Sequence, residues 1–383
     1  MTQISLINGR VLIDGELRNG LAVSLEGGVI TAVGPQETAD GDVVDLGGDI
    51  LAPGFIDTQV NGGGGALFND DPSVECIAAI GAAHRRFGVT GFLPTLISDD
   101  LEVVDRAIDA VDAAIGGGVP GVLGIHIEGP FLSQARQGIH DASKFQRLDE
   151  RLVERLTRLR RGRTLITLAP ERTTPSVIRA LAEAGAIVSL GHTDAEYATA
   201  RAALDAGATG VTHLFNAMSP MLSRAPGVVG AALEDPRPWC GLIVDGRHVH
   251  PAVLKVALRS RPLDRFMLVT DAMPNVGLGT DHFFLQGRRI TVQDGVCRDD
   301  RGVLAGSALD MAQAVRNAMA LLGLSLGQAA AMASAFPAAF LGMTDSRGRI
   351  AAGYAADLVL LNDAGEARST WISGRRQVVE PSA

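Results

Sequence analysis

Eight short apolar segments recur through the middle of the chain, and helical segments separate most of them. The apolar segments are rich in β-branched residues, whereas the stretches between them are rich in Ala, Leu and Arg. Strands that alternate with helices favour parallel pairing, and eight such units in series predict an α/β fold of the (β/α)8, TIM-like barrel type. A doubly wound open sheet stays open as the alternative. The segments are residues 54–60, 88–95, 122–129, 164–171, 186–193, 210–216, 239–246 and 265–272.

The two ends of the chain follow a different pattern, in which apolar and polar residues alternate between Gly and Asp turns. Such alternation is typical of antiparallel strands. We expect residues 1–52 and 349–383 to form one small β-sandwich domain and residues 53–348 to form the barrel domain. Within the barrel domain, the pattern predicts a hairpin over residues 283–305 and closing helices over residues 307–341.

Composition narrows the class of partner. The formal net charge is −9, and an acidic surface repels the phosphates of nucleic acid. The first 15 residues lack the basic start and apolar core of a signal peptide, and no apolar run approaches a membrane span. The three cysteines form no CxxC pair, which fits a reducing cytoplasm better than a disulfide framework. We therefore expect a cytoplasmic protein that binds a small molecule, and neither nucleic acid nor a membrane.

Ionisable residues lie at or near the carboxyl ends of five of the apolar segments. In a closed barrel these ends meet at one mouth, where barrel enzymes carry their active sites. A single residue of this kind is commonly a helix cap or a turn residue, but several at equivalent positions predict an active site. They are Glu128, His192, His213, Asp245 with the nearby His248, and Asp271.

Glu128, His192 and His213 form a candidate metal site. Two neutral imidazoles and one carboxylate suit Zn²⁺ and leave a position for water. Their separations match no local metal motif, so the prediction depends on their shared placement at strand ends; the alternative is two barrel histidines satisfied by hydrogen bonds. Asp271 is then a candidate general acid/base, taking a proton from a metal-activated water and passing it to a leaving amine. The alternative for Asp271 is a buried structural aspartate.

Six motifs occur in one order along the chain and together resemble the N-acetylglucosamine-6-phosphate deacetylase family of the amidohydrolase superfamily. The likeness extends over essentially the whole chain, since LAPGFID and GRIAAGYAADLVLL near its ends match the superfamily as well. The motifs are HIEGPF (126–131), GHTDA (191–195), THLFNAM (212–218), APGVVG (225–230), LIVDGRHV (242–249) and LVTDAM (268–273).

The resemblance implies hydrolysis of N-acetyl-D-glucosamine 6-phosphate to D-glucosamine 6-phosphate and acetate by a homodimeric enzyme. Three alternatives stay open. The substrate can be the galacto epimer, N-acetyl-D-galactosamine 6-phosphate; the reaction can be another amidohydrolase reaction, such as cyclic amide or dipeptide hydrolysis; or the barrel can bind a sugar phosphate without catalysis.

The resemblance also implies a role for each matching residue. Glu128, His192 and His213 would bind the metal, Asp271 would act as general acid/base, and His140 would polarise the acetyl carbonyl. The phosphate would be held by Asn216, Ala217 and Arg224. The full set of implied substrate contacts is Ile139, His140, Asn216, Ala217, Arg224, Asp245, Gly246, Arg247, His248, Leu304, Ala305 and Gly306.

One departure from the superfamily limits the number of metal ions. Many amidohydrolases carry His-x-His at the end of the first barrel strand, where this chain has Gln59-Val60-Asn61, and an amide is a poor zinc ligand beside imidazole. Neither Lys144 nor Lys255 lies at the end of the fourth strand, so the usual bridging lysine is missing as well. We expect one divalent ion per subunit, Zn²⁺ in the first place, with Fe²⁺, Co²⁺ or Mn²⁺ as alternatives.

Two further segments invite a functional interpretation. The glycine run at 61–65 lacks the GK[ST] of a phosphate-binding P-loop, so we expect a flexible loop near the barrel mouth. The arginine-rich run at 158–163 has no interleaved aromatic residues, and we expect the solvated end of a helix.

Overall fold

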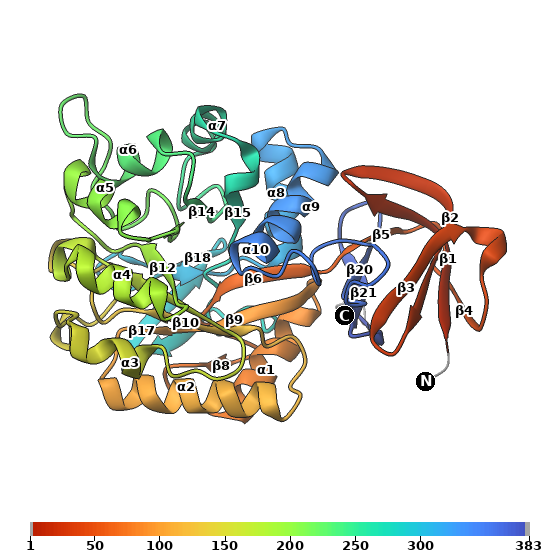
Figure 1. Cartoon of the computed structure of the whole chain (residues 1–383), viewed down its shortest axis with the longest axis horizontal. Helices are drawn as coiled ribbons and strands as arrows, with labels where there is room; N and C mark the ends of the chain where they lie inside the picture. Colours follow the sequence, from red (N-terminus) through yellow and green to blue (C-terminus); the bar gives the residue numbers. More distant parts are fainter. Residues whose placement is uncertain (1–2, 380–383) are drawn as a thin grey trace.

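The computed structural model describes residues 3–379 and contains a parallel sheet of eight strands in the order β15-β14-β13-β12-β11-β10-β9-β6. The helices lie outside this sheet (Figure 1). Each predicted apolar segment overlaps one strand, so the barrel prediction is confirmed. The strands are β6 (Phe55–Val60), β9 (Val89–Ile97), β10 (Gly124–Glu128), β11 (Arg163–Leu168), β12 (Ile187–Leu190), β13 (Gly210–Val211), β14 (Trp239–Leu242) and β15 (Phe266–Leu268).

The helices begin and end where local sequence signals place them. Thr174 caps α4 through a hydrogen bond from Val177 N, and Ser325 and Gln328 form a capping box at the start of α9. Gly323 ends α8 with a φ of 77°, a conformation that favours glycine. The helices are α1 (Val74–Arg85), α2 (Leu101–Gly116), α3 (Val153–Leu156), α4 (Pro175–Glu183), α5 (Tyr197–Asp205), α6 (Gly227–Glu234), α7 (Pro251–Ser260), α8 (Met311–Leu322), α9 (Leu326–Ala333) and α10 (Ala335–Phe340).

The barrel closes between β6 and the segment after β15 without a continuous strand ladder. Within residues 3–379 the backbones of these two strands share no ladder, and the isolated bridge Val60–Ala272 lies just beyond β15. Asp57, which is fully buried, accepts hydrogen bonds from Thr270 N at 3.3 Å and Thr270 Oγ1 at 2.5 Å. This seam lies directly before Asp271 in the sequence.

The two ends of the chain meet in a second eight-stranded sheet, which stands apart from the barrel (Figure 1). Its path is β22-β21-β20-β5-β1-β2-β3, and β5 pairs antiparallel with β20. Not every pair is antiparallel as predicted, because β1 runs parallel to both β4 and β5. Trp371 fills the small core of this sheet. The strands are β1 (Ile4–Ile13), β2 (Glu16–Glu26), β3 (Val29–Pro35), β4 (Asp42–Asp45), β5 (Ile50–Pro53), β20 (Leu358–Leu361), β21 (Ala367–Ile372) and β22 (Arg375–Val378).

The insertion after the last barrel strand is larger than the predicted hairpin. It is an antiparallel sheet of four strands, β16 (His282–Leu285), β17 (Arg288–Gln293), β18 (Val296–Arg298) and β19 (Leu304–Ser307). Its apolar face packs against Ile97, Ile139 and Met273. The insertion therefore covers one side of the barrel mouth.

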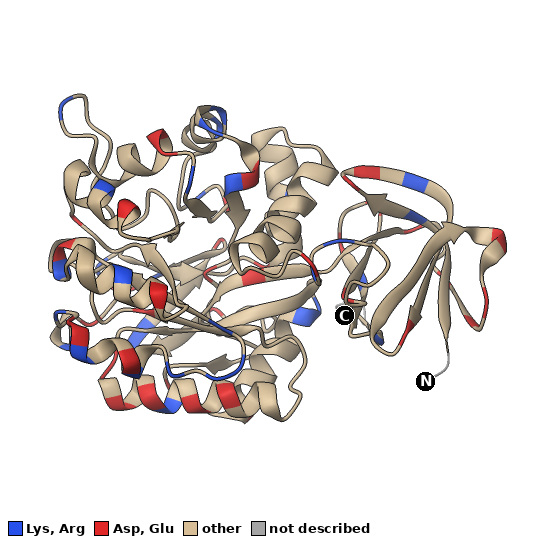
Figure 2. Ribbon diagram, in the orientation of Figure 1, with Lys and Arg blue, Asp and Glu red and all other residues tan. Residues whose placement is uncertain are grey.

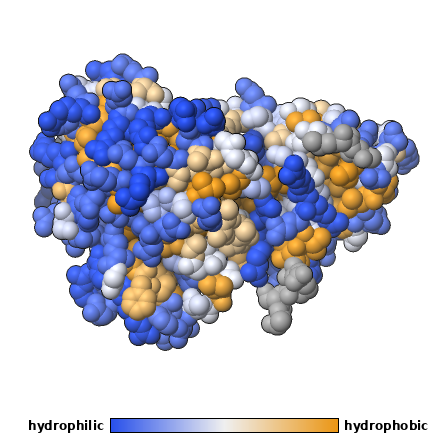
Figure 3. Space-filling model, turned by 90° about the horizontal axis from the view of Figure 1, so that it is seen from below, coloured by the Kyte–Doolittle hydropathy of each residue, from blue (hydrophilic) through white to orange (hydrophobic). Residues whose placement is uncertain are grey.

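The outer surface mixes polar and apolar residues. Figure 3 shows hydrophilic residues over much of the barrel, with apolar patches nearer the terminal sheet. In the described part of the chain, no helix combines the length and the apolar character needed to cross a membrane.

Candidate active site

Glu128, His192 and His213 come together at the carboxyl ends of β10, β12 and β13. Glu128 Oε1 lies 3.0 Å from His213 Nε2 and 3.3 Å from His192 Nε2, and the two histidine nitrogens are 3.1 Å apart. All three residues are buried. The barrel has thus brought together the three side chains that the sequence analysis selected as metal ligands.

Both histidines follow their strands in a left-handed backbone conformation. His192 has a φ of 47° and His213 a φ of 33°, and Asp271 beyond β15 has a φ of 52°. Such a conformation cannot continue a β ladder, so β13 ends at Val211 and His213 lies beyond the strand that was predicted to carry it. Each non-glycine residue in this region costs on the order of 1–3 kcal/mol, and such residues cluster at functional sites.

The spacing and chemistry of the three donors fit a divalent cation. A tetrahedral site with bonds of about 2.0–2.2 Å separates its ligand atoms by roughly 3.4 Å, close to the separations observed. His192 Nδ1 donates to Arg136 O at 3.0 Å, which leaves the Nε2 lone pair directed at Glu128. Burial alone would raise the pKa of Glu128, but its contacts with the His192 and His213 rings hold that pKa well below its usual range.

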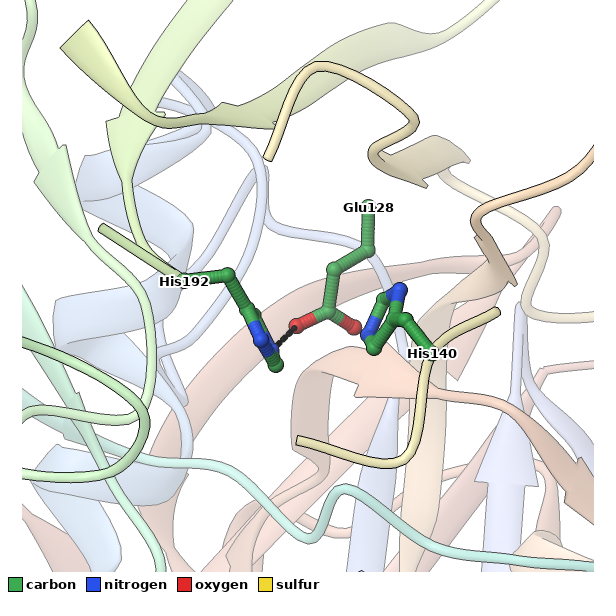
Figure 4. Close-up of side chains that lie close together, drawn as sticks. All are labelled: Glu128, His140 and His192. Atoms are coloured by element: carbon green, nitrogen blue, oxygen red, sulfur yellow. Dashed lines mark ion pairs between the residues drawn. The ribbon is translucent and has the colours of Figure 1, made fainter. Parts of the chain in front are cut away.

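His140 lies beside this group but differs from it in chemistry. One possible metal-ligand atom from each of His140, Glu128 and His192 lies within 4.8 Å of the other two, and Figure 4 shows the three side chains. However, Ser98 N donates to His140 Nδ1 at 3.3 Å, so Nδ1 is an acceptor and a neutral ring carries its proton on Nε2. Burial lowers the pKa of His140 well below its usual range, so the ring is neutral at pH 7. A protonated Nε2 is a hydrogen-bond donor and not a metal ligand, and His213 is therefore the better third ligand.

Two amides hold Asp271, and one of them also contacts Glu128. Asn61 Nδ2 donates to Asp271 Oδ1 at 2.7 Å, and Gln59 Nε2 lies 3.2 Å from both Asp271 Oδ1 and the two Glu128 oxygens. Burial, and next the negative charge of Glu128, raise the pKa of Asp271 to about 6. A carboxyl group with this pKa exchanges protons readily near neutral pH.

Gln59 and Asn61 were interpreted from the sequence only as the loss of a metal site, and no role in holding Asp271 was predicted for them. Two amides at i and i+2 on one strand point to the same face, and this was the signal available. The neighbouring glycine run is also more ordered than expected, since Gly62 and Gly63 form strand β7 against β8 (Ala66–Leu67). His84 Nε2 lies 2.9 Å from Gly62 O and supports this segment.

A cavity of about 360 Å³ opens above these side chains, a volume suited to a small molecule. Its wall includes Glu128, His192, His213 and Asp271. Of the other residues selected from the sequence, the wall includes Ile139, His140, Asn216, Ala217, His248, Leu304 and Gly306.

Five of the selected residues are not part of this wall: Arg224, Asp245, Gly246, Arg247 and Ala305. Arg224 and Arg247 are exposed, and Ala305, on β19, is buried in the core of the inserted sheet. Asp245 Oδ2 lies 2.6 Å from His248 Nδ1, so Asp245 orients a wall residue and does not itself face the cavity. Conversely, the wall contains Arg136, which the sequence analysis did not select.

Comparison with known proteins places this geometry in a family. The sequence matches the amidohydrolase family over residues 50–376. It is 45% identical over 373 residues to N-acetylgalactosamine-6-phosphate deacetylase of Shewanella sp. (strain ANA-3), covering 95% of this chain and 93% of the relative. It is 39% identical over 345 residues to N-acetylglucosamine-6-phosphate deacetylase of Bos taurus, covering 86% of this chain and 84% of the relative.

A solved structure agrees with the sequence relatives. It is a mutant N-acetyl-D-glucosamine-6-phosphate deacetylase from Mycobacterium smegmatis in complex with N-acetyl-D-glucosamine-6-phosphate. The TM-score is 0.91 at 34% identity, and the match covers 98% of this chain and 99% of that chain.

Proposed function

The chain belongs to the amidohydrolase family, and we propose that it hydrolyses N-acetyl-D-glucosamine 6-phosphate to D-glucosamine 6-phosphate and acetate. One observation carries the proposal: the donor atoms of Glu128, His192 and His213 lie 3.0–3.3 Å apart at a cavity whose wall also holds Asp271. Three ligands for a cation beside a proton acceptor are the parts that metal-assisted amide hydrolysis requires.

Zn²⁺ is the cation we assign to Glu128, His192 and His213, because two imidazoles and a carboxylate suit it; Fe²⁺, Co²⁺ and Mn²⁺ are alternatives for the same donors. A divalent cation at this position supplies Lewis-acid polarisation and lowers the pKa of water.

The side chains around the cation site have three further roles: proton transfer, stabilisation of the carbonyl oxygen and binding of the sugar phosphate. Asp271, held by Asn61 and Gln59, accepts the proton of the attacking water and later passes it to the leaving nitrogen. His140 presents Nε2–H as the donor that stabilises the carbonyl oxygen as negative charge develops on it. Asn216 and His248 line the cavity as polar contacts for the sugar phosphate.

Release of acetate from N-acetyl-D-glucosamine 6-phosphate tests the proposal. We expect turnover by the Zn²⁺-loaded enzyme, loss of turnover after treatment with a chelator, and recovery when Zn²⁺ is restored. Undiminished activity in protein shown by elemental analysis to be free of metal would overturn the mechanism.

The galacto epimer is a second candidate substrate, because the relative at 45% identity carries the name N-acetylgalactosamine-6-phosphate deacetylase. Comparing kcat/KM for the two epimers decides between them. A higher value for the galacto epimer would correct the sugar and leave the reaction intact, whereas a metal-loaded protein that releases acetate from neither would be a binding barrel without catalysis.

We further propose that the enzyme acts as a homodimer in the cytoplasm. Met221 and Leu222 are 55% and 59% exposed on the same segment as Arg224, which lies outside its own cavity wall. A second copy that covered these apolar side chains would place Arg224 near the partner. The three cysteines are free and buried, as suits a reducing compartment. A monomeric mass in solution at micromolar concentration would contradict the dimer.

A further inference from the structure

Arg136 is the one permanently charged cation in the cavity wall formed by residues 3–379. It lies between β10 and β11, in the segment that also carries His140. Its side chain is 35% exposed, so it is neither fully solvated nor part of the core. A cation in the wall of a small-molecule site is expected to meet a negative group of the ligand.

Contacts at both ends hold Arg136 in place. Its carbonyl oxygen accepts the hydrogen bond from His192 Nδ1 at 3.0 Å, so its backbone is fixed against a metal ligand. Its Nε donates to Asp194 Oδ1 at 2.8 Å. Asp194 is itself fixed, because Glu171 accepts hydrogen bonds from Asp194 N at 2.7 Å and from Thr193 Oγ1 at 2.6 Å.

This anchoring leaves the far end of the guanidinium available. Within the described chain, Nε is the only guanidinium nitrogen of Arg136 with a hydrogen-bond partner, so Nη1 and Nη2 keep their donors. The anchor also lies next to the turn expected to hold phosphate, because Thr193 N donates to Ala217 O at 3.1 Å. Two adjacent N–H groups of arginine match two oxygens of a phosphate, a geometry that lysine cannot copy.

We propose that Arg136 binds the phosphate group of the substrate through its two terminal nitrogens and thereby contributes to the preference for a phosphorylated amino sugar. This assignment rests on the proposed function, since it concerns the same cavity. The pair with Asp194 is partly exposed, with side chains 35% and 47% exposed, so it contributes little to stability and does not account for the placement of Arg136.

Kinetics of Arg136→Gln test the role in substrate binding. Loss of a charge-assisted contact is expected to raise KM for N-acetyl-D-glucosamine 6-phosphate by about 10-fold or more, with kcat changed much less. The value of kcat/KM for unphosphorylated N-acetyl-D-glucosamine is expected to stay unchanged. Arg136→Lys keeps the positive charge but lacks the two adjacent N–H groups of the guanidinium. Its KM is therefore expected to lie between those of the wild type and Arg136→Gln.

Arg289→Gln is the matched control, because Arg289 is exposed on the inserted sheet and outside the cavity wall, yet its loss changes the net charge equally. It is expected to behave as the wild type. An unchanged KM in Arg136→Gln, or an equal loss on both substrates, would overturn the proposal.

Binding of inorganic phosphate separates this proposal from the proposed function. Calorimetric titration of the metal-loaded protein is expected to give a Kd at least about 10-fold weaker for Arg136→Gln than for the wild type and Arg289→Gln. Equal affinities in the three proteins would refute the role of Arg136 even if acetate is released normally. Absence of acetate release by the wild type would refute the proposed function, whatever the phosphate titration shows.

Discussion

In two places in this protein, acidic side chains lie against basic ones, and the two places differ mainly in their access to water. At the barrel mouth, the Glu128 side chain is 2% exposed and faces two buried histidines. On the outer surface, acidic residues follow α2 (Figure 2), where Arg155 and Asp105 pair at 2.6 Å with side chains 30% and 33% exposed. Water screens the outer pair, whereas a buried carboxylate must find compensation within the protein.

The outer cluster also corrects one expectation. The arginine-rich run was expected to be the solvated end of a helix, but α3 ends at Leu156, before the run starts. Arg158 instead pairs with Asp109, and Arg160 and Arg161 pair with Asp112. These arginines attach a loop to α2, while the buried cluster forms a site for a cation. The same ion types thus serve attachment in one place and chemistry in the other, and six variants test that difference.

The largest effect is expected for Asp271→Asn. General acid–base catalysis contributes about 10²–10⁴-fold, so kcat should fall by that factor. The variant should retain its metal, because Asp271 is not among the three ligands. Steady-state kinetics with metal analysis of the same sample measure both quantities. Turnover within threefold of the wild type would remove Asp271 from proton transfer.

His140→Ala is expected to lower kcat by about 10²–10³-fold, the typical cost of one oxyanion donor. Ser98→Ala should cost less, because Ser98 contacts only the far side of the ring, at 2.8 Å from Nδ1. Measuring metal content for both variants separates the two roles considered for His140. Loss of metal in His140→Ala would make His140 a ligand and contradict the tautomer deduced from Ser98 N.

Asp57 gives a test through the pH dependence of stability. Burial raises its pKa to about 7 from 3.8, so folding favours the protonated form. Its contribution to stability is complete below pH 4 and is lost as the pH rises through 7, an effect on the order of a few kcal/mol. The free energy of unfolding of Asp57→Asn should therefore fall less than that of the wild type between pH 4 and pH 8, in denaturant titrations at several pH values.

Asp112, on α2, is also largely buried, but the shift of its pKa has the opposite sign. Burial acts to raise its pKa, but hydrogen bonds from Arg160 and Arg161 outweigh burial and lower it. Its contribution is present at neutral pH and is lost as the pH falls through the lowered pKa, so Asp112→Asn should destabilise most at neutral pH. Parallel pH profiles for the Asp57 and Asp112 variants would show that the arginine partners of Asp112 do not set the sign.

The smallest effect is expected for Arg155→Ala. A partly exposed ion pair contributes about 0–1 kcal/mol, and added salt should reduce this contribution further. Urea unfolding in low and high salt measures the contribution of the ion pair and its dependence on salt. A loss above 2 kcal/mol in the free energy of unfolding would mean that the ion pairs on α2 act as one cooperative network. Water would then screen them less than their exposed fractions indicate.

The sequence predicted the barrel because its information is local. Apolar runs and helical stretches alternate at short range, and each predicted segment does overlap one strand. The additional strands of the insertion were missed because β18 and β19 are only three and four residues long, too short for a periodic pattern. The seam at Asp57 was missed for another reason: its partner Thr270 lies more than two hundred residues away in the sequence.

What the sequence by itself determined is the set of chemical groups and the strand ends on which they stand: a glutamate, two histidines and an aspartate. What only the tertiary structure decided is which atoms meet, since Glu128 and His192 are brought together by closure of the barrel. The fold also places Ser98 N against His140 Nδ1, so that the proton of the His140 ring is on Nε2. It places Arg136 in the wall of the cavity. Hydrogen bonds act over about 3 Å, and the strand pattern, which places residues at the same barrel mouth, does not specify contacts at that precision.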